Sequence, residues 1–364
     1  MTLRTATAII DLNALVNNLH YIKKQAPNSK VLAVLKANAY GHGLERIAKA
    51  LSESEHQADA FGVARLDEAL ALRAAGITAP IVLLEGFFDK SDLDIITENN
   101  LQTIVHNQEQ LTSLCTAKLE QPLKVWLKID TGMHRLGINP DDLPAFYAEL
   151  QANKNVHADI VLMSHLGCAD DLSNQGTANQ IALFEDITSG LQNSKSMANS
   201  AGICAWPQSH YQWVRPGLML YGVSPLQANE SNTLVSLQPV MTLQSSLIAI
   251  RNIVKGESVG YGAAWQAEKD TTIGVIAIGY GDGYPRHAEN GTPVLVNDRI
   301  VPLIGRVSMD MITVDLGENA QDCIGDIATL WGKGLPVEKV ARWATTIPYE
   351  LLCNISRRVQ VSVE

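Results

Sequence analysis

Short apolar runs alternate with amphipathic stretches from the start of the chain to about residue 225. Aliphatic residues bounded by turn formers predict buried strands at residues 31–35, 61–64, 81–84, 102–105, 125–129 and 160–163. Between them, residues 44–51 and 66–75 carry apolar side chains at helical spacing, and Gly76 follows the second stretch as expected for a helix C-terminus. Such alternation is typical of parallel βα units.

Two weaker runs complete this pattern. Residues 195–199 and 218–221 predict a seventh and an eighth strand, which would close a (β/α)8 barrel of the TIM type within roughly the first 225 residues. In the strand around residue 126, polar residues and Trp126 alternate with aliphatic ones. Barrel strands turn their aliphatic face toward the surrounding helices, so we expect Lys128 and Asp130 to point into the lumen.

The pattern changes beyond about residue 230. Short runs at 240–254, 272–278, 292–296 and 300–303, punctuated by Gly and Pro, predict a mainly β domain. The polar stretch 227–232 is the expected linker. We therefore expect an α/β protein with an N-terminal (β/α)8 TIM-like barrel over residues 1–228 and a C-terminal mainly-β domain over residues 229–364.

Composition narrows the class of protein. The formal net charge of -10 argues against a nucleic-acid partner. The five cysteines are widely spaced without a Cys-x-x-Cys pair, which suggests neither a disulfide framework nor a zinc site. No apolar run reaches the length of a membrane span, and the N-terminus lacks the apolar segment of a signal peptide. We expect a soluble, cytoplasmic protein that binds no membrane.

Lys36 closes an apolar run and opens a glycine-rich turn. A lysine there can be partly desolvated, which favours a neutral amine and Schiff-base chemistry, although this pattern alone more often marks a snorkelling surface lysine. Other reactive side chains also fall near the ends of predicted strands, where a parallel barrel places its active site. They are Tyr40, Arg135, His165, Asn199, Ser200 and Arg215, the last lying before the predicted eighth strand. His165 and Cys168 are too few for a metal site.

Two glycine-flanked tyrosines, Tyr261 and Tyr280, lie in the second domain. Glycine permits a tight turn and a close approach to a ligand, but each segment taken alone more often reflects loop packing. The spacing at Gly279 is not that of a dinucleotide fingerprint.

The segment Ala33-Val-Leu-Lys-Ala-Asn-Ala-Tyr-Gly-His-Gly resembles the pyridoxal 5'-phosphate (PLP) attachment motif of alanine racemases. Further segments resemble that family in the same order: Lys128-Ile-Asp-Thr-Gly-Met-His-Arg-Leu-Gly, Ser164-His-Leu, Asn199-Ser, Arg215-Pro-Gly-Leu-Met-Leu-Tyr-Gly, Gly260-Tyr-Gly, Gly305-Arg-Val-Ser-Met-Asp and Pro348-Tyr-Glu. The resemblance covers essentially the whole chain. It implies a PLP-dependent isomerase that interconverts L- and D-alanine, in a head-to-tail homodimer with composite active sites. Whether it would serve peptidoglycan synthesis or alanine catabolism stays open.

The resemblance assigns the two proton carriers. It implies that Lys36 holds PLP and handles the D-alanine proton, while Tyr261 of the partner subunit handles the L-alanine proton. Deprotonating a free tyrosine at neutral pH costs about 4 kcal/mol. His165, contacted by Arg215, is implied to bind Tyr261 and favour its phenolate, and Arg215 is implied to face the pyridine nitrogen.

The resemblance also assigns binding residues and implies no metal. For the cofactor these are Tyr40, His165, Asn199, Ser200, Gly217, Leu218 and Tyr349, besides Lys36 and Arg215. For the substrate they are Arg135, Met309, Lys128, Tyr280 and Asp310. Arg135 and the Met309 amide are implied to bind the substrate carboxylate, with Lys128, a lysine often carbamylated in the family, orienting Arg135.

Three other interpretations compete with racemisation. Another PLP enzyme of the same architecture is one, although Arg215 in place of an acidic partner for the ring argues against it. A PLP carrier protein is another, but it has no need of residues 230–364. A cofactor-free Schiff-base aldolase is the third, and it would lack a visible chromophore attached at Lys36.

Overall fold

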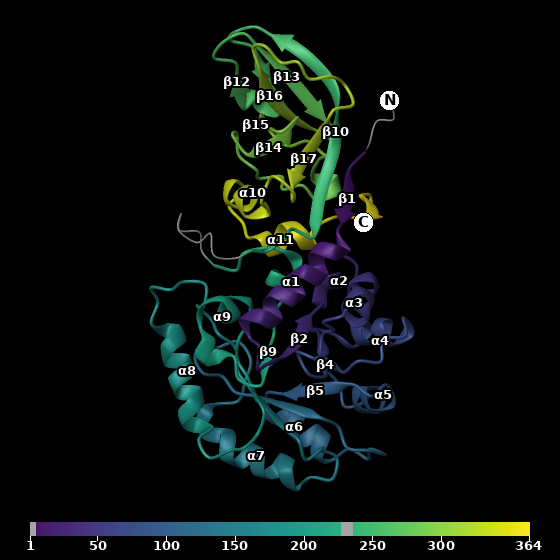
Figure 1. Ribbon diagram of the computed structural model, residues 1–364, viewed down its shortest axis with the longest axis vertical. Coiled ribbons are helices and arrows are strands. Elements are labelled where there is room, and N and C mark those ends of the chain that lie inside the picture. The colour runs from purple at the N-terminus through teal and green to yellow at the C-terminus, as the bar shows by residue number, and fades with distance from the viewer. Residues whose placement is uncertain (1–4, 227–235) are drawn as a thin grey trace.

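The computed structural model describes residues 5–226 and 236–364, which form a barrel and a β domain stacked end to end (Figure 1). Eight parallel strands close the barrel in chain order, with β2 pairing with both β3 and β9. They are β2 (Lys30–Val34), β3 (Ala60–Val63), β4 (Ile81–Leu83), β5 (Gln102–Val105), β6 (Val125–Lys128), β7 (Val161–Met163), β8 (Lys195–Ser196) and β9 (Trp213–Val214). The predicted fold class is confirmed.

Helices surround these strands and bury apolar side chains against them. The helices are α1 (Leu12–Gln25), α3 (Leu44–Glu53), α4 (Leu66–Ala74), α5 (Asp92–Glu98), α6 (Gln108–Cys115), α7 (Leu143–Ala152), α8 (Gly176–Ile187) and α9 (Ser200–Ala205), with the short turns α2 (Lys36–Tyr40), η1 (Pro140–Asp142), η2 (Pro207–Ser209) and η3 (Leu218–Tyr221). The predicted helix beginning at Leu66 ends at Ala74, and Gly76 adopts a φ of +85° two residues later.

The predicted eighth strand at residues 218–221 is wrong, because these residues form the 3-10 turn η3 and β9 closes the barrel instead. A buried run of four apolar residues has the same hydrophobicity in either conformation, so the pattern does not distinguish them. Arg215 and Gly217 therefore follow the last strand, at the same end of the barrel as the other candidates. The seventh strand also ends early, and Asn199 caps α9.

On the face of β6 that was predicted to line the lumen, Trp126 and Lys128 do point into it. The Trp126 ring lies 5.3 Å from that of Trp213 on β9. Because β6 and β9 are not neighbours in the barrel, these rings meet across the lumen. Lys128 lines the cavity at the end of the strand. Asp130 instead turns back on its own loop, where its Oδ1 accepts bonds from three successive backbone amides beginning at Gly132.

The β domain is built around one long strand, β10. Its first half pairs with β1 and β17 and its second half with β13. The elements are β1 (Thr7–Ile10), β10 (Met241–Ile253), β11 (Ser258–Val259), η4 (Tyr261–Ala263), β12 (Trp265–Gln266), β13 (Thr271–Ile276), η5 (Tyr280–Asp282), β14 (Pro293–Val296), β15 (Arg299–Ile304), β16 (Ile312–Gly317), β17 (Ile327–Trp331), α10 (Val337–Trp343), α11 (Pro348–Cys353) and β18 (Gln360–Val363).

The N-terminal strand β1 joins this sheet rather than the barrel. It lies between β10, antiparallel to it, and β18, parallel to it. No periodicity in residues 7–10 indicates which sheet they join. The predicted linker at residues 227–232 falls outside the described ranges, and the division at residue 228 stays a prediction.

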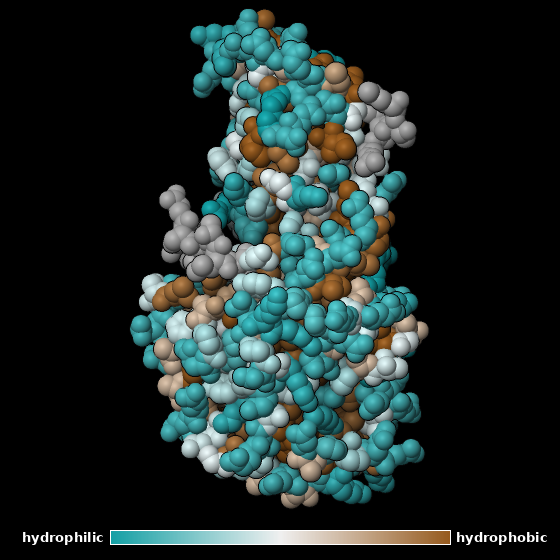
Figure 2. Space-filling model, viewed as in Figure 1, coloured by the Kyte–Doolittle hydropathy of each residue, from teal (hydrophilic) through white to brown (hydrophobic). Residues whose placement is uncertain are grey.

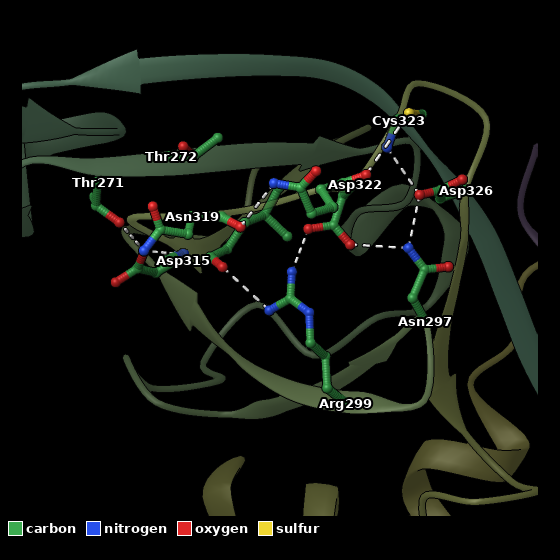
Figure 3. Close-up of polar contacts among 12 residues, drawn as sticks. Thr271, Thr272, Asn297, Arg299, Asp315, Asn319, Asp322, Cys323 and Asp326 are labelled. Carbon is green, nitrogen blue, oxygen red and sulfur yellow. Dashed lines mark hydrogen bonds and ion pairs between the residues drawn. The ribbon is translucent and has the colours of Figure 1, made fainter.

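Hydrophobic side chains form one continuous core through the barrel, the junction and most of the β domain. On the face drawn in Figure 2, hydrophilic residues cover most of the barrel, and hydrophobic patches are more frequent on the β domain. At the rim of the β domain, Arg299 pairs with Asp322, whose side chain is only 1% exposed (Figure 3). Asn297 also donates to Asp322 and to Asp326, which ties their loop to the strands. Within the described ranges, no helix has the length and hydrophobicity needed to cross a membrane.

Candidate active site

A cavity of about 580 Å³ opens at the C-terminal ends of the barrel strands. Most of the predicted site residues line it: Lys36, Tyr40, Lys128, Arg135, His165, Asn199, Ser200, Arg215, Gly217, Leu218 and Tyr349. The prediction missed Val34, Ala37, Leu84, Glu85, Leu136, Met163, Ile347 and Cys353. Leu84 and Glu85 directly follow β4, so the strand-end rule could have found them. Ile347 and Cys353 flank Tyr349 at the two ends of α11, so only the resemblance at Pro348-Tyr-Glu could have pointed to them.

Four predicted site residues lie outside the cavity wall, on the β domain. Tyr261 is 70% exposed, Met309 is 53% exposed and Tyr280 is 41% exposed. Tyr280 and Met309 belong to adjoining loops, because the Gly281 amide donates to the Met309 carbonyl at 2.9 Å. Asp310 accepts a bond from Arg358 at 2.8 Å. Within one chain, none of these four residues lines the cavity.

Lys36 begins a turn of left-handed helix. Ala37, Asn38, Ala39 and Tyr40 have φ values between 51° and 55°. Left-handed helical backbone costs roughly 1–2 kcal/mol per residue for most L-amino acids, so side chains must hold this turn. Glu68 at the start of α4 accepts from the Ala37 amide at 2.7 Å. Asn38 accepts from the Leu44 amide at 2.9 Å, which joins the turn to α3.

Arg215 and His165 form a fixed pair in the cavity wall. Arg215, only 4% exposed, donates to Ser196 and to the Ser164 carbonyl, each at 2.6 Å. Its Nη2 also lies 3.3 Å from His165 Nδ1. A guanidinium can only donate, so Nδ1 accepts and the proton of a neutral His165 is on Nε2. Burial and then the nearby cation Arg215 hold the pKa of His165 well below its usual value, which keeps the ring neutral.

Gln180 of α8, which was not among the predicted site residues, holds the backbone of His165 through a hydrogen bond. Its amide donates to the His165 carbonyl at 2.9 Å and accepts from the Gly167 amide at 2.9 Å.

Positive charge gathers in the cavity. Among the lining side chains of the described residues, Lys36, Lys128, Arg135 and Arg215 are cationic and Glu85 alone is acidic. Burial first, and then the charges of Arg215, Arg135 and Lys36, lower the pKa of Lys128 from 10.5 to about 8. Such a cavity suits a ligand that carries several negative charges. The described residues contain no group of three or more His, Cys, Asp or Glu side chains suited to a metal ion.

Polar groups at one side of the cavity suit a phosphate. Ser200 Oγ accepts from the Gly217 amide at 3.0 Å, which joins α9 to the loop after β9. Tyr40 lies so close to Gly217 that an added Cβ there would come within 2.6 Å of its hydroxyl. Burial raises the pKa of Tyr40 well above the ordinary value, so its hydroxyl stays protonated and able to donate. A lysine at a strand end beside an anion-binding corner fits PLP, which needs both an amine and a phosphate site.

A closed parallel barrel with a strand-end lysine, joined to a β domain, defines a class of PLP-dependent enzymes. Family models for the N-terminal and C-terminal domains of alanine racemase match residues 10–225 and 240–363. The chain belongs to the alanine racemase family, whose members are PLP-dependent isomerases.

Individual relatives agree over the full length. An alanine racemase of Photobacterium profundum is 56% identical over 361 residues, which cover 99% of both chains. The crystal structure of the biosynthetic alanine racemase of Pseudomonas aeruginosa is 43% identical, with a TM-score of 0.95 and 99% of each chain covered. That of Bartonella henselae alanine racemase, with covalently bound pyridoxal phosphate, is 30% identical, with a TM-score of 0.90 and 99% of each chain covered.

Proposed function

We propose that this enzyme racemises alanine with two bases, Lys36 and Tyr261 of the partner subunit. Bound PLP supplies the electron sink that acidifies the Cα–H of the amino acid. Lys36 would hold PLP, with its phosphate near Tyr40, Asn199, Ser200, Gly217, Leu218 and Tyr349 and its ring near His165 and Arg215. The observation that carries this proposal is the contact between Arg215 and His165, because it gives the second base an electrostatic partner.

The histidine tautomer suits a tyrosine base. With Nδ1 accepting from Arg215, the Nε2–H of His165 is the group that can donate to another side chain. A phenolate at that position gains a hydrogen bond from a ring already polarised by a guanidinium, which lowers the cost of removing the Tyr261 proton. Tyr261 would then return or remove the proton of L-alanine, while Lys36 serves D-alanine on the opposite face.

We propose that the second subunit supplies Tyr261 and Met309. Both are more than half exposed on the β domain of one chain, outside its own cavity. A head-to-tail homodimer would bring this surface over the cavity of the other chain and bury it, as obligate interfaces do with exposed aromatic and Met side chains. Tyr280, with Asp310 behind it, would then narrow the mouth of the cavity.

The substrate carboxylate would bind Arg135 and the Met309 amide. Lys128 would orient Arg135, but two like charges side by side oppose that role. Addition of carbon dioxide to the neutral Lys128 amine, with loss of one proton to solvent, would leave a negatively charged carbamate that pairs with Arg135. The lowered pKa of Lys128, about 8, provides more of that amine near neutral pH. We further propose a cytoplasmic location, which suits the free thiols found in the described ranges.

Subunit mixing tests the composite site. Lys36→Ala and Tyr261→Phe homodimers should each be nearly inactive. After verified exchange, a heterodimer holds one site with both bases intact, so activity should return to a fraction of that of wild type. Deuterium incorporation at Cα of D-alanine formed from L-alanine in heavy water would establish the chemistry directly. Absence of recovery would overturn the composite site, and absence of both D-alanine and deuterium would overturn the function.

A further inference from the structure

A histidine with no assigned role lies just after the left-handed turn that begins at Lys36. His42 is 1% exposed and follows the turn by two residues. Its ring stacks on Tyr221 at 4.5 Å between centroids, and Tyr221 in turn donates to the carbonyl of Val34, in the strand leading to Lys36. His42 does not line the cavity, so it touches neither substrate nor cofactor there.

One nitrogen of His42 contacts two carbonyls of the turn. Nδ1 lies 3.0 Å from the Ala39 oxygen and 2.8 Å from the Tyr40 oxygen. A carbonyl can only accept, so Nδ1 carries the proton and shares it between them. Nε2 is then the unprotonated nitrogen, and it is buried without a hydrogen-bond partner. Burial lowers the pKa of His42 to about 4, so this tautomer persists at neutral pH.

These contacts hold a backbone that ordinary residues avoid. Ala39 and Tyr40 are the last two of four consecutive non-glycine residues with positive φ, and Gly41 follows them with a φ of +80°. In the left-handed conformation both of their carbonyls point toward His42 Nδ1, whereas a right-handed turn would point them away from it. The position of the Tyr40 ring in the cavity wall, and of Lys36 at the other end of the turn, depends on this backbone.

We infer that His42 is a positioning residue whose Nδ1–H holds the left-handed turn and so presents Lys36 and Tyr40 to the cofactor. The inference rests on the proposed roles of Lys36 and Tyr40 only for its effect on PLP binding. Its effect on the backbone of the turn exists in the protein without cofactor and is independent of racemisation.

Asparagine and glutamine, whose side chains end in an amide, provide a matched pair of substitutions at residue 42. Asn places an N–H at the distance of Nδ1 along the side chain, whereas Gln places it at the distance of Nε2. His42→Asn should therefore restore the contact with the carbonyls, and His42→Gln should not. His42→Phe keeps a ring that can stack on Tyr221 but removes the donor.

Hydrogen exchange of the apoprotein measures the turn directly. In His42→Phe and His42→Gln, amides in residues 36–43 should exchange at least about ten-fold faster, whereas those of β5 (Gln102–Val105) should keep the wild-type rate. PLP titration of the same proteins should show affinity weakened about ten-fold. His42→Asn should stay near wild type in both measurements.

Several outcomes would overturn the inference. Unchanged exchange in residues 36–43 of His42→Phe would show that the donor does not hold the turn. Equal acceleration in β5 would assign His42 to general stability, and a His42→Asn protein as impaired as His42→Gln would show that Nδ1 is not the group that acts. If both exchange predictions hold but Lys36→Ala still racemises alanine, the proposed catalytic roles fail while the role of His42 in the backbone stands.

Discussion

Gly217→Ala tests whether the Tyr40 hydroxyl binds the cofactor phosphate. An added Cβ at residue 217 would lie 2.6 Å from that hydroxyl, whereas ordinary contact begins near 3.4 Å. Tyr40 must then move its hydroxyl by roughly 0.8 Å, the difference between those two distances, and its packing against Tyr221 at 4.8 Å leaves little freedom to turn. A hydrogen bond to a charged group contributes about 1.5–3 kcal/mol, so we expect a loss of about 2 kcal/mol. This corresponds to roughly 30-fold weaker PLP binding.

The assay is titration of the apoprotein with PLP, followed by visible circular dichroism. The control is the same substitution in a Tyr40→Phe background, where the hydroxyl is already absent. The next nearest atom, Cζ, lies 3.2 Å from the added Cβ and needs to yield only slightly. Gly217→Ala should therefore weaken binding by less than about three-fold in that background. Equal losses in both backgrounds would refute the proposed contact, because the methyl group would then act elsewhere.

Three further predictions concern stability. Protonated Lys128 costs the folded apoprotein about 3 kcal/mol at pH 7, so Lys128→Met should raise the free energy of unfolding by about 1–2 kcal/mol in carbonate-free buffer. That gain should shrink between pH 8 and 10.5 in urea titrations, as the folded wild type loses this proton. His42 has a lower pKa in the folded state than when unfolded, so its contribution is full above pH 6.5 and is lost toward pH 4. His42→Asn should therefore lose up to about 3 kcal/mol less stability than wild type on acidification. If the free energy of unfolding falls equally steeply between pH 6.5 and pH 4 in both proteins, this prediction is wrong. Asp322→Asn should destabilise by about 1 kcal/mol because the covered Asp322 carboxylate loses its charge beside the half-exposed Arg299, whereas Asp159→Asn, in a pair with Lys124 whose carboxylate is 49% exposed, should cost under about 0.5 kcal/mol. Equal midpoints of thermal unfolding for Asp322→Asn and wild type would contradict the prediction for Asp322.

The barrel could be predicted because its strands are buried on both faces. Such strands read as continuous aliphatic runs, and β2 through β7 were found within a residue or two of their bounds. β9 is only two residues long, too short for any periodicity to register. The apolar run at η3 was therefore mistaken for it, since burial alone does not reveal backbone conformation.

Most of the cavity could be predicted by position, because parallel strands end on one side of a barrel. The left-handed turn could not. Ala37 and Ala39 are strong right-handed helix formers, and only distant partners such as Glu68 and His42 hold the turn otherwise. The periodicity did not show that Tyr261 lies outside the cavity of its own chain, because this depends on how the two domains are stacked, and only the family resemblance implied it.

The strand β1 ties residues 7–10 to residues 360–363, which lie far apart in the sequence. Both of its neighbours, β10 and β18, are translated long after it. A nascent barrel can therefore fold on the ribosome while β1 still waits unpaired, and a chain that stops before β18 displays an open strand edge that invites aggregation. In the proposed dimer, each β domain completes the other subunit's cavity. A chain truncated before β18 would thus leave one edge of β1 unpaired in the domain that its partner needs.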